Sequence, residues 1–285
     1  MTEKYLHFYT ALLIDQYVSC DKNKRILRNI PTDNLSYGLL ITIQGGGSGS
    51  GYFVNKDNKT FLVTAKHLLF DEKGNLRGDL SNIIAYTKDI EHNETIEFQI
   101  SLKAAKNAGE ILDNGKDDVV AILCGKSDDK KLLTMPNYLK LTNTPEGGII
   151  GVAFASMKVL DEVLMANDVY IVGFPSSVGL KNIPQLDYKT PLARKGIVAG
   201  KNKGLNTIIL DCEVYPGNSG GPVIEVERDN LNFEYRLIGT ISQYVPFALN
   251  VKDNNNKDTG YALNNSGYSV IVPNDPIIDL INNHT

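Results

Sequence analysis

The sequence VYPGNSGGPVI at residues 214–224 places Ser219 between glycines and directly before an apolar run. A serine hydroxyl becomes a strong nucleophile when a neighbouring base, usually a histidine, removes its proton. The same stretch also has a simpler explanation, because its glycines suit a tight turn that leads into a buried strand. A chemical role for Ser219 therefore requires a histidine elsewhere in the chain and a group that orients it.

Of the four histidines, His67 stands in the context best suited to such a role. It follows the apolar run FLVTAK, where a rigid strand leads into a loop. We expect the others to be solvated surface residues: His7 near the N-terminus, His92 in the polar run KDIEHNET, and His284 one residue from the C-terminus. His67 is thus the candidate base for Ser219.

A carboxylate that could orient His67 precedes the apolar run in NGKDDVVAIL. Alternation along a strand points the side chains of Asp117 and Asp118 to opposite faces, so only one of them can serve. We favour Asp118, because it abuts the apolar run directly. His67, Asp118 and Ser219 would then be a base, its orienting acid and a nucleophile.

The elements that would position these three residues are short strands. Apolar or alternating runs recur between turn-forming clusters, as is typical of an all-β chain with barrel-like spacing. The expected strands cover residues 39–43, 51–54, 61–65, 82–86, 118–123, 169–174, 195–200, 206–214, 221–226, 235–242 and 268–272. A polar loop with Pro136 and Pro145 indicates a junction near residue 140 between two β-barrels of similar size.

Helices are expected only near the two ends of the chain. One is predicted around Leu6 to Val18, and the other in PNDPIIDLINN, where Asn274 or Asp275 would cap the helix and Pro276 would occupy its first turn. Residues 250–266, VKDNNNKDTGYALNNSG, form the most loop-like segment of the chain.

The sequence indicates neither a metal site nor a cofactor. Asp253 and Asn255 resemble part of a calcium loop, but Lys257 stands where an oxygen ligand would be required and no glutamate follows at the right distance. The three cysteines, Cys20, Cys124 and Cys212, lie far apart and form no CxxC pair, which argues against zinc and against a disulfide framework.

Composition limits the partners and the location. The 285 residues are 42% hydrophobic and 22% charged, as in ordinary soluble globular proteins, and the net charge of −4 gives no reason to expect nucleic acid or an anionic membrane as a partner. No window approaches the roughly 20 apolar residues that span a bilayer, and the N-terminus lacks the pattern of a secretion signal. With the separated cysteines, these features favour the cytoplasm.

The motifs resemble those of trypsin-like serine proteases. TAKH at 64–67 is similar to the histidine motif of this family, DVVAIL to its aspartate strand and GNSGGP at 217–222 to its nucleophile motif, in the same chain order. The resemblance extends from about Leu39 to Pro273 and is closer to bacterial HtrA-like branches, without a PDZ domain, than to secreted digestive enzymes.

This resemblance implies a fold of two six-stranded antiparallel β-barrels of chymotrypsin type. An N-terminal extension, residues 1–38, would precede a first barrel, residues 39–140, which carries the histidine and the aspartate. The second barrel, residues 141–285, would carry the serine and end in the C-terminal helix.

The resemblance also implies a serine endopeptidase that cleaves protein or peptide substrates through an acyl-enzyme on Ser219. The backbone N–H groups of Gly217 and Ser219, with Asn218 between them, would form the oxyanion hole. Ser242 would pack near the aspartate. The backbone of Gln243 and Tyr244 would pair with the substrate as an added strand.

The residue preferred before the scissile bond stays open at this point. Glu213, six positions before the serine, would lie at the floor of the primary pocket and favour a basic residue. In HtrA-like relatives, the next position, here Val214, helps to shape a pocket for aliphatic side chains, and Glu213 would then point to solvent or to a loop cation. Tyr244 at the pocket mouth and Gly267 on a neighbouring strand do not decide between the two.

Control of the activity is a further expectation from the resemblance. Secreted relatives become active when a new N-terminal amine pairs with an aspartate just before the serine, but here Asn218 holds that position and no IVGG-like start appears near Leu39. We expect control by narrow specificity, loop ordering or a regulatory protein partner, with residues 1–38 as the candidate contact.

Other functions remain alternatives. GNSGG also fits the nucleophile elbow of α/β-hydrolase esterases, which would assign the acid to Asp275 or Asp279 and the base to His284. A protease fold that serves as a catalytically silent binding module is another alternative. The glycine-rich QGGGSGSGYF at 44–53 matches neither GxGxxG nor a P-loop, so we expect a loop between strands there.

Overall fold

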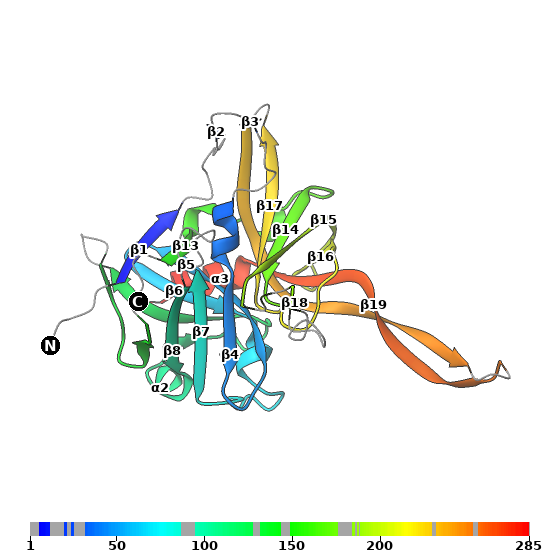
Figure 1. The fold of residues 1–285 in the computed structure, drawn as a ribbon, viewed down its shortest axis with the longest axis horizontal. Coiled ribbons are helices and arrows are strands. Elements are labelled where there is room, and N and C mark those ends of the chain that lie inside the picture. The colour runs from blue at the N-terminus through cyan, green and yellow to red at the C-terminus, as the bar shows by residue number, and fades with distance from the viewer. Residues whose placement is uncertain are drawn as a thin grey trace.

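The computed structural model describes residues 6–11, 20–21, 24–25, 32–86, 95–127, 132–143, 149–175, 184–185, 187, 189–229, 232–252 and 256–284. These residues fold mainly as strands, which form two β-sheet units that lie side by side (Figure 1). The prediction of an all-β chain is confirmed.

The first unit is an eleven-stranded sheet. Six of its strands pair antiparallel with one another. They are β4 (Leu39–Ile43), β5 (Ser48–Lys56), β6 (Lys59–Thr64), β7 (Leu80–Tyr86), β8 (Thr95–Ser101) and β10 (Val120–Ser127). The others are β1 (Leu6–Ala11), β9 (Ile111–Leu112), β11 (Leu132–Thr134), β12 (Leu139–Leu141) and β13 (Ile149–Ala153). A separate pair consists of β2 (Cys20–Asp21) and β3 (Lys24–Arg25).

The prediction of an N-terminal helix around Leu6 to Val18 is wrong for residues 6–11, the part of this segment that the structure describes. Residues 6–11 form β1, which pairs in parallel with β13 and antiparallel with β11. The stretch LHFYTA contains the aromatic residues Phe8 and Tyr9 and the β-branched Thr10, and pairing with two neighbouring strands outweighs the helical apolar spacing seen in the sequence. Residues 12–18 of that prediction lie outside the described residues.

The second unit is a closed six-stranded barrel in the strand order β14-β15-β16-β19-β18-β17. Its strands are β14 (Asp168–Gly173), β15 (Leu192–Asn202), β16 (Thr207–Asp211), β17 (Pro222–Asp229), β18 (Asn232–Lys252) and β19 (Asp258–Pro273). Alternate residues such as Ile171, Leu210 and Ile241 fill its interior.

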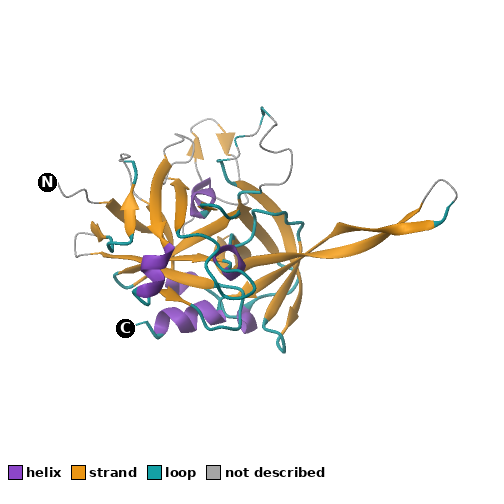
Figure 2. Cartoon of the chain, turned by 90° about the horizontal axis from the view of Figure 1, so that it is seen from below, coloured by secondary structure: helices purple, strands orange, loops and turns teal. Residues whose placement is uncertain are grey.

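Much of the loop predicted at residues 250–266 is strand. The ends of β18 and β19 continue as a two-stranded ribbon that projects from the barrel (Figures 1 and 2). Apolar residues at positions 249 and 251 and at 261 and 263 alternate with their neighbours, a strand pattern that the many Asn residues obscured. Asp253 and Asn255 lie outside the described residues.

Helices are short. They are α1 (Lys66–Leu69), α2 (Leu102–Asn107) and α3 (Asp275–Asn282), with 3₁₀ turns η1 (Thr32–Tyr37), η3 (Phe154–Ser156) and η4 (Leu160–Glu162). The predicted C-terminal helix is confirmed, although the Asn274 side chain does not cap it and instead donates to the carbonyl oxygens of Lys158 and Leu237. In the part of the chain that the structure describes, no helix is long and apolar enough to cross a bilayer.

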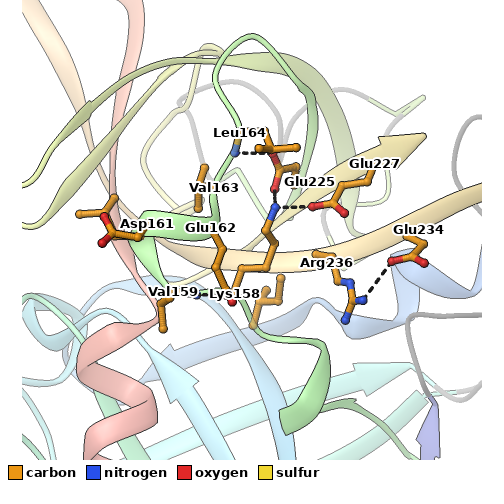
Figure 3. Close-up of polar contacts among 12 residues, drawn as sticks. Lys158, Val159, Asp161, Glu162, Val163, Leu164, Glu225, Glu227, Glu234 and Arg236 are labelled. Carbon is orange, nitrogen blue, oxygen red and sulfur yellow. Dashed lines mark hydrogen bonds and ion pairs between the residues drawn. The ribbon is translucent and has the colours of Figure 1, made fainter. Parts of the chain in front are cut away.

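The segment between the two units contains Lys158, and a buried ion pair holds it against Glu225 of β17 (Figure 3). Lys158 Nζ donates to Glu225 Oε2 at 2.5 Å and also to Glu227, while Glu225 Oε1 accepts from Leu164 N at 2.9 Å. Burial disfavours the charge on Lys158, but the hydrogen bonds that it donates to these two carboxylates outweigh burial and raise the pKa of the ammonium. Glu225 is fully buried, so this lysine is the group that neutralises it.

The two units share an apolar core. Tyr52 and Val54 of β5 pack in the same cluster as Ile224 of β17 and Leu237 of β18. The Tyr52 hydroxyl lies 2.8 Å from Thr240 Oγ1, which gives this interface a buried polar contact. This packing holds β5 of the first unit against β17 and β18 of the second.

Candidate active site

His67 lies in α1, directly after β6. Its ring Nδ1 lies 2.7 Å from Asp118 Oδ2, and its backbone N–H donates to Asp118 Oδ1 at 2.9 Å. A single carboxylate therefore contacts both the ring and the backbone of the histidine and fixes the orientation of the imidazole. Arg77 holds the same helix from the other side, because its Nε donates to the His67 carbonyl at 2.8 Å.

Asp118 precedes β10 and receives a further hydrogen bond from the second unit. Ser242 Oγ donates to Asp118 Oδ2 at 2.5 Å. Burial disfavours the carboxylate, but the hydrogen bonds from His67 and Ser242 outweigh burial and hold the pKa of Asp118 below its usual range. Asp117 instead accepts a hydrogen bond from Asn114. Of the two aspartates considered from sequence, only Asp118 is seen to contact the histidine.

Ser219 lies in the loop before β17 and shares a cleft with His67 and Asp118. Its Oγ donates to the carbonyl oxygen of Ser242 at 3.0 Å. Among the described residues, no hydrogen bond joins Ser219 Oγ to the His67 ring. Such bonds are often long without a substrate and form when it binds.

The cleft has a volume of about 710 Å³. It is lined by Gly47, Ser48, His67, Leu68, Arg77, Asp118, Tyr215, Pro216, Gly217, Ser219, Ser242, Gln243 and Tyr244. Seven of the predicted site residues line this cleft: His67, Asp118, Gly217, Ser219, Ser242, Gln243 and Tyr244. Asn218 is not among the lining residues.

Ser50 of β5 anchors the loop that carries Ser219. Its side chain is fully buried, and its Oγ donates to the Gly217 carbonyl at 2.6 Å and accepts from Phe174 N at 2.9 Å. Its backbone N–H donates to the Ser219 carbonyl at 2.8 Å. Sequence reasoning missed this role, because Ser50 lies in the glycine-rich stretch 44–53 that was expected to be a loop, an expectation that is wrong from Ser48 onward, where β5 begins.

Asn218 completes the geometry of the loop from within. Its side-chain Oδ1 accepts from Tyr215 N at 2.9 Å, and its backbone N–H donates to the Tyr215 carbonyl at 2.9 Å. Asn218 is only 2% exposed, so it acts as a brace beneath the cleft rather than as part of the wall. Within the described ranges, the N–H groups of Gly217 and Ser219 donate to no protein acceptor.

Two glycines of the loop are required by geometry. Gly217 has a φ of 95°, and Gly220 has a φ of 87°. A Cβ on Gly220 would lie 2.1 Å from the Ser50 carbonyl oxygen and 2.3 Å from Thr64 Oγ1. The loop can approach β5 and β6 this closely only without a side chain at that position.

Glu213 is not placed as a free carboxylate at a pocket floor. Its Oε2 lies 3.3 Å from an Arg194 guanidinium nitrogen, and Arg194 stacks on the Tyr215 ring with its Cζ 4.6 Å from the centroid. Glu213 is also absent from the residues that line the cleft. Both expectations for Glu213 stay predictions, and its contact with Arg194 favours the one in which this carboxylate points to a cation.

Val214 and Gly267 likewise lie outside the cleft lining. Val214 is 2% exposed and packs in the barrel interior, while its carbonyl accepts from Asn265 Nδ2 at 2.7 Å. Gly267 has a φ of 87°, and its N–H donates to Asn265 Oδ1 at 3.0 Å. Asn265 thus links these two predicted residues outside the cleft lining.

His284, the base in the α/β-hydrolase alternative, is engaged elsewhere. Its Nε2 lies 2.8 Å from Glu110 Oε2, and its ring packs edge-on against Phe61. The side chain is 11% exposed, so the expectation of a solvated residue at a frayed end is also wrong. The contacts with β6 and with Glu110 hold the chain end in place. In the described residues, no group of three His, Cys, Asp or Glu side chains could hold a metal ion.

Comparisons with known proteins agree with this architecture. A profile of the trypsin-like peptidase domain matches residues 49–231. Human heparin-binding protein is similar in structure, with a TM-score of 0.51 at 14% identity over 90% of this chain and 96% of that chain. A crystal structure of Deg5 gives a TM-score of 0.44 at 15% identity over 74% of this chain and 81% of that one. No curated protein sequence matches the chain.

The likeness to human heparin-binding protein shows the fold, two β-sheet units of chymotrypsin type with a C-terminal helix. The profile spans more than half of the chain and includes His67, Asp118 and Ser219. The chain therefore belongs to the family of trypsin-like peptidase domains.

Proposed function

We propose that the protein is a serine endopeptidase that hydrolyses peptide bonds through an acyl-enzyme on Ser219. The observation that carries this proposal is the position of Asp118, which contacts His67 and Ser242 in the cleft that Ser219 lines. Ser219 Oγ attacks the peptide carbonyl, and His67 takes its proton and later donates it to the leaving amine. Asp118 keeps the ring oriented and stabilises its protonated form.

The N–H groups of Gly217 and Ser219 stabilise the oxyanion in this proposal. Asn218 and Ser50 support it, because they fix the peptide between Gly217 and Asn218 from both ends. A preorganised donor of this kind contributes roughly 3 to 4 kcal/mol to transition-state stabilisation.

The substrate is a protein or peptide that pairs as an extended strand with Gln243 and Tyr244. The ion pair between Glu213 and Arg194 removes the reason to expect a basic residue before the scissile bond. We therefore favour an apolar residue of medium size at that position. A series of fluorogenic peptides that varies only this residue tests the choice, and preference for Arg or Lys would contradict it.

Activation by a new N-terminal amine is not part of the proposal. Asn218 accepts its hydrogen bond from Tyr215 N, so the loop is braced by a neutral group within the turn. Narrow specificity or a regulatory protein partner would then restrain the enzyme, in the cytoplasm that the cysteine usage favours.

Hydrolysis of a denatured protein such as unfolded casein tests the proposal. The wild type should cleave it, whereas Ser219→Ala and His67→Ala should each lose nearly all activity and the double variant should be little worse. Equal activity in all of these proteins would overturn the assignment.

A catalytically silent binding module is the second candidate. One observation favours it: Ser219 Oγ donates to the Ser242 carbonyl rather than to the His67 ring. A wild-type protein that binds peptides but cleaves none of them would support this candidate over the endopeptidase.

A further inference from the structure

The ribbon formed by residues 246–252 of β18 and 258–265 of β19 has no other strand beside it in the described part of the chain; we call it the arm. Its strands pair from Pro246 with Asn265 to Lys252 with Asp258. β17 supports β18 only as far as Thr240, and β16 supports β19 only from Tyr268 onward. Both figures of the whole chain show the arm extending away from the barrel (Figures 1 and 2).

Both faces of the arm carry exposed apolar side chains. Phe247, Leu249 and Val251 alternate along β18 and share one face, with exposures of 41%, 44% and 45%. Leu263 and Tyr261 lie opposite residues 248 and 250 and share the other face, with exposures of 59% and 71%.

An isolated two-stranded ribbon is only marginally stable in water, and exposed apolar patches of this kind mark sites of interaction. The charged residues within the arm, Lys252 and Asp258, face each other at its far end. The surface between that end and the barrel is therefore uncharged, and it is apolar except at Asn250, Thr259, Asn264 and Asn265, which favours an uncharged partner with apolar side chains.

The arm is continuous with the cleft. Ser242, Gln243 and Tyr244 line the cleft, and β18 continues as one strand from these residues to Lys252, with a shift in its register against β19 between Tyr244 and Pro246. The distance along the strand from Tyr244 to Lys252 is about 26 Å at 3.3 Å per residue. A polypeptide that lies along Gln243 and Tyr244 in an antiparallel register has its residues before the scissile bond directed along this strand.

We propose that the arm binds the substrate segment on the N-terminal side of the scissile bond, and that this segment is extended, uncharged and apolar at alternate positions. This inference rests on the proposed function, because it assigns the arm to the substrate of the same site. The outer edge of β18 supplies backbone groups to an added strand. Pro246 has no N–H, so the ladder is interrupted there and the apolar side chains carry most of the contact.

Peptide length is the variable that tests the proposal. The reference is a cleaved fluorogenic peptide with about four residues before the scissile bond. It is compared with three longer peptides, each extended by about eight residues. The first has alternating Val and Thr added at the N-terminus, and the second has Gly and Ser added there. The third has alternating Val and Thr added at the C-terminus. We expect only the N-terminal Val and Thr extension to raise kcat/KM, by about tenfold or more.

The matched variants separate the arm from general surface effects. One variant replaces residues 247–264 with an Asn-Gly turn between the paired Pro246 and Asn265, and a second carries Phe247→Ser, Leu249→Ser and Val251→Ser, which keeps the ribbon in place. Leu205→Ser is the control, because Leu205 is 70% exposed and lies outside the arm. The ratio of kcat/KM for the N-terminally extended Val and Thr peptide to that for the reference peptide should fall to near one in both arm variants. In the control it should stay as high as in the wild type.

Three results would overturn the proposal. One is an equal increase of kcat/KM with peptide length in the wild type and the arm variants. Another is an increase of kcat/KM with the Gly and Ser extension or with the C-terminal extension. The third is an arm-dependent dimer, seen by light scattering, with the length dependence unchanged, which would assign the arm to a second copy of this chain.

A binding measurement distinguishes failure of this proposal from failure of the proposed function. The long and short peptides are titrated into Ser219→Ala, with and without the shortened arm, and fluorescence anisotropy gives each Kd. Arm-dependent binding of the long peptide supports the inference even if the wild type cleaves nothing. Cleavage by the wild type with arm-independent binding rejects the inference and leaves the proposed function standing.

Discussion

Ser50 Oγ donates to the Gly217 carbonyl oxygen at 2.6 Å across the interface of the two β-sheet units. The backbone N–H of Ser50 donates to the Ser219 carbonyl, so one residue of β5 holds the Gly217–Asn218 and the Ser219–Gly220 peptides. Because the two N–H groups proposed as oxyanion donors belong to this loop, their positions depend on a residue that never faces the cleft.

Ser50→Ala should therefore lower kcat/KM by about 10- to 100-fold, mainly through kcat. The substitution leaves Gly217 O and Phe174 N without their partner, which should also cost about 1 to 3 kcal/mol of unfolding free energy. Steady-state kinetics and urea unfolding measure the two effects. The control is Ser81→Ala, because the buried Ser81 hydroxyl has no hydrogen-bond partner in the described structure. A change in KM alone would contradict a role in positioning the loop.

The lowered pKa of Asp118 predicts a pH dependence of stability. Its folded pKa lies below the usual value of about 3.9, so the stabilisation is fully present above that value and is lost as pH falls through the folded pKa. The unfolding free energy of the wild type should decrease more steeply than that of Asp118→Asn between about pH 5 and pH 2. Ser242→Ala should have a shallower decrease than the wild type, because it removes one hydrogen bond that lowers this pKa. Parallel curves for all three proteins would contradict the assignment.

Lys158→Ala should destabilise the fold by about 3 to 5 kcal/mol, because it leaves Glu225 buried without a counter-ion. The matched control is Arg236→Ala, since the more exposed pair of Arg236 with Glu234 should contribute less than about 1 kcal/mol (Figure 3). Adding Glu225→Gln to the lysine variant should restore part of the loss, because it removes the unpaired charge. Equal effects of Lys158→Ala and Arg236→Ala on urea unfolding would contradict the role given to this ion pair.

Burial predicts that two thiols are unreactive in the folded protein. Burial raises the pKa of Cys124 to about 12 and that of Cys212 to about 11, so few thiolates form near neutral pH. Iodoacetamide at about pH 8 should leave both unmodified until urea unfolds the chain, as peptide mass spectrometry can measure. Rapid modification of either residue in the native protein would contradict the described packing.

The strands could be predicted largely because each half-buried run repeats apolar residues at strand spacing. The prediction failed where local spacing and tertiary pairing disagree. Residues 6–11 have helical apolar spacing but lie between β11 and β13, and the apolar residues of the arm are interleaved with Asn and Gly. Strand β8 was also missed, although Ile96, Phe98 and Ile100 alternate with polar neighbours in it.

Only those residues of the candidate site that stand in a local sequence motif could be predicted. His67, Asp118 and Ser219 each stand in a recognisable local sequence, and the structure brings them to one cleft. Ser50 and Arg77 act through contacts with residues distant in sequence or with backbone carbonyls, which leave no local pattern. The contact of Glu213 with Arg194 of β15 could not be predicted for a related reason, since the two residues are 19 positions apart in the sequence.

Labelling with a fluorophosphonate probe, with the adduct located by peptide mass spectrometry, tests the central claim most directly. The wild type should carry one adduct, on Ser219, and Ser219→Ala should carry none. His67→Ala should react at least about a thousandfold more slowly, because the hydroxyl then lacks its base. A folded wild type that forms no adduct on Ser219, or reacts no faster than His67→Ala, would contradict the account.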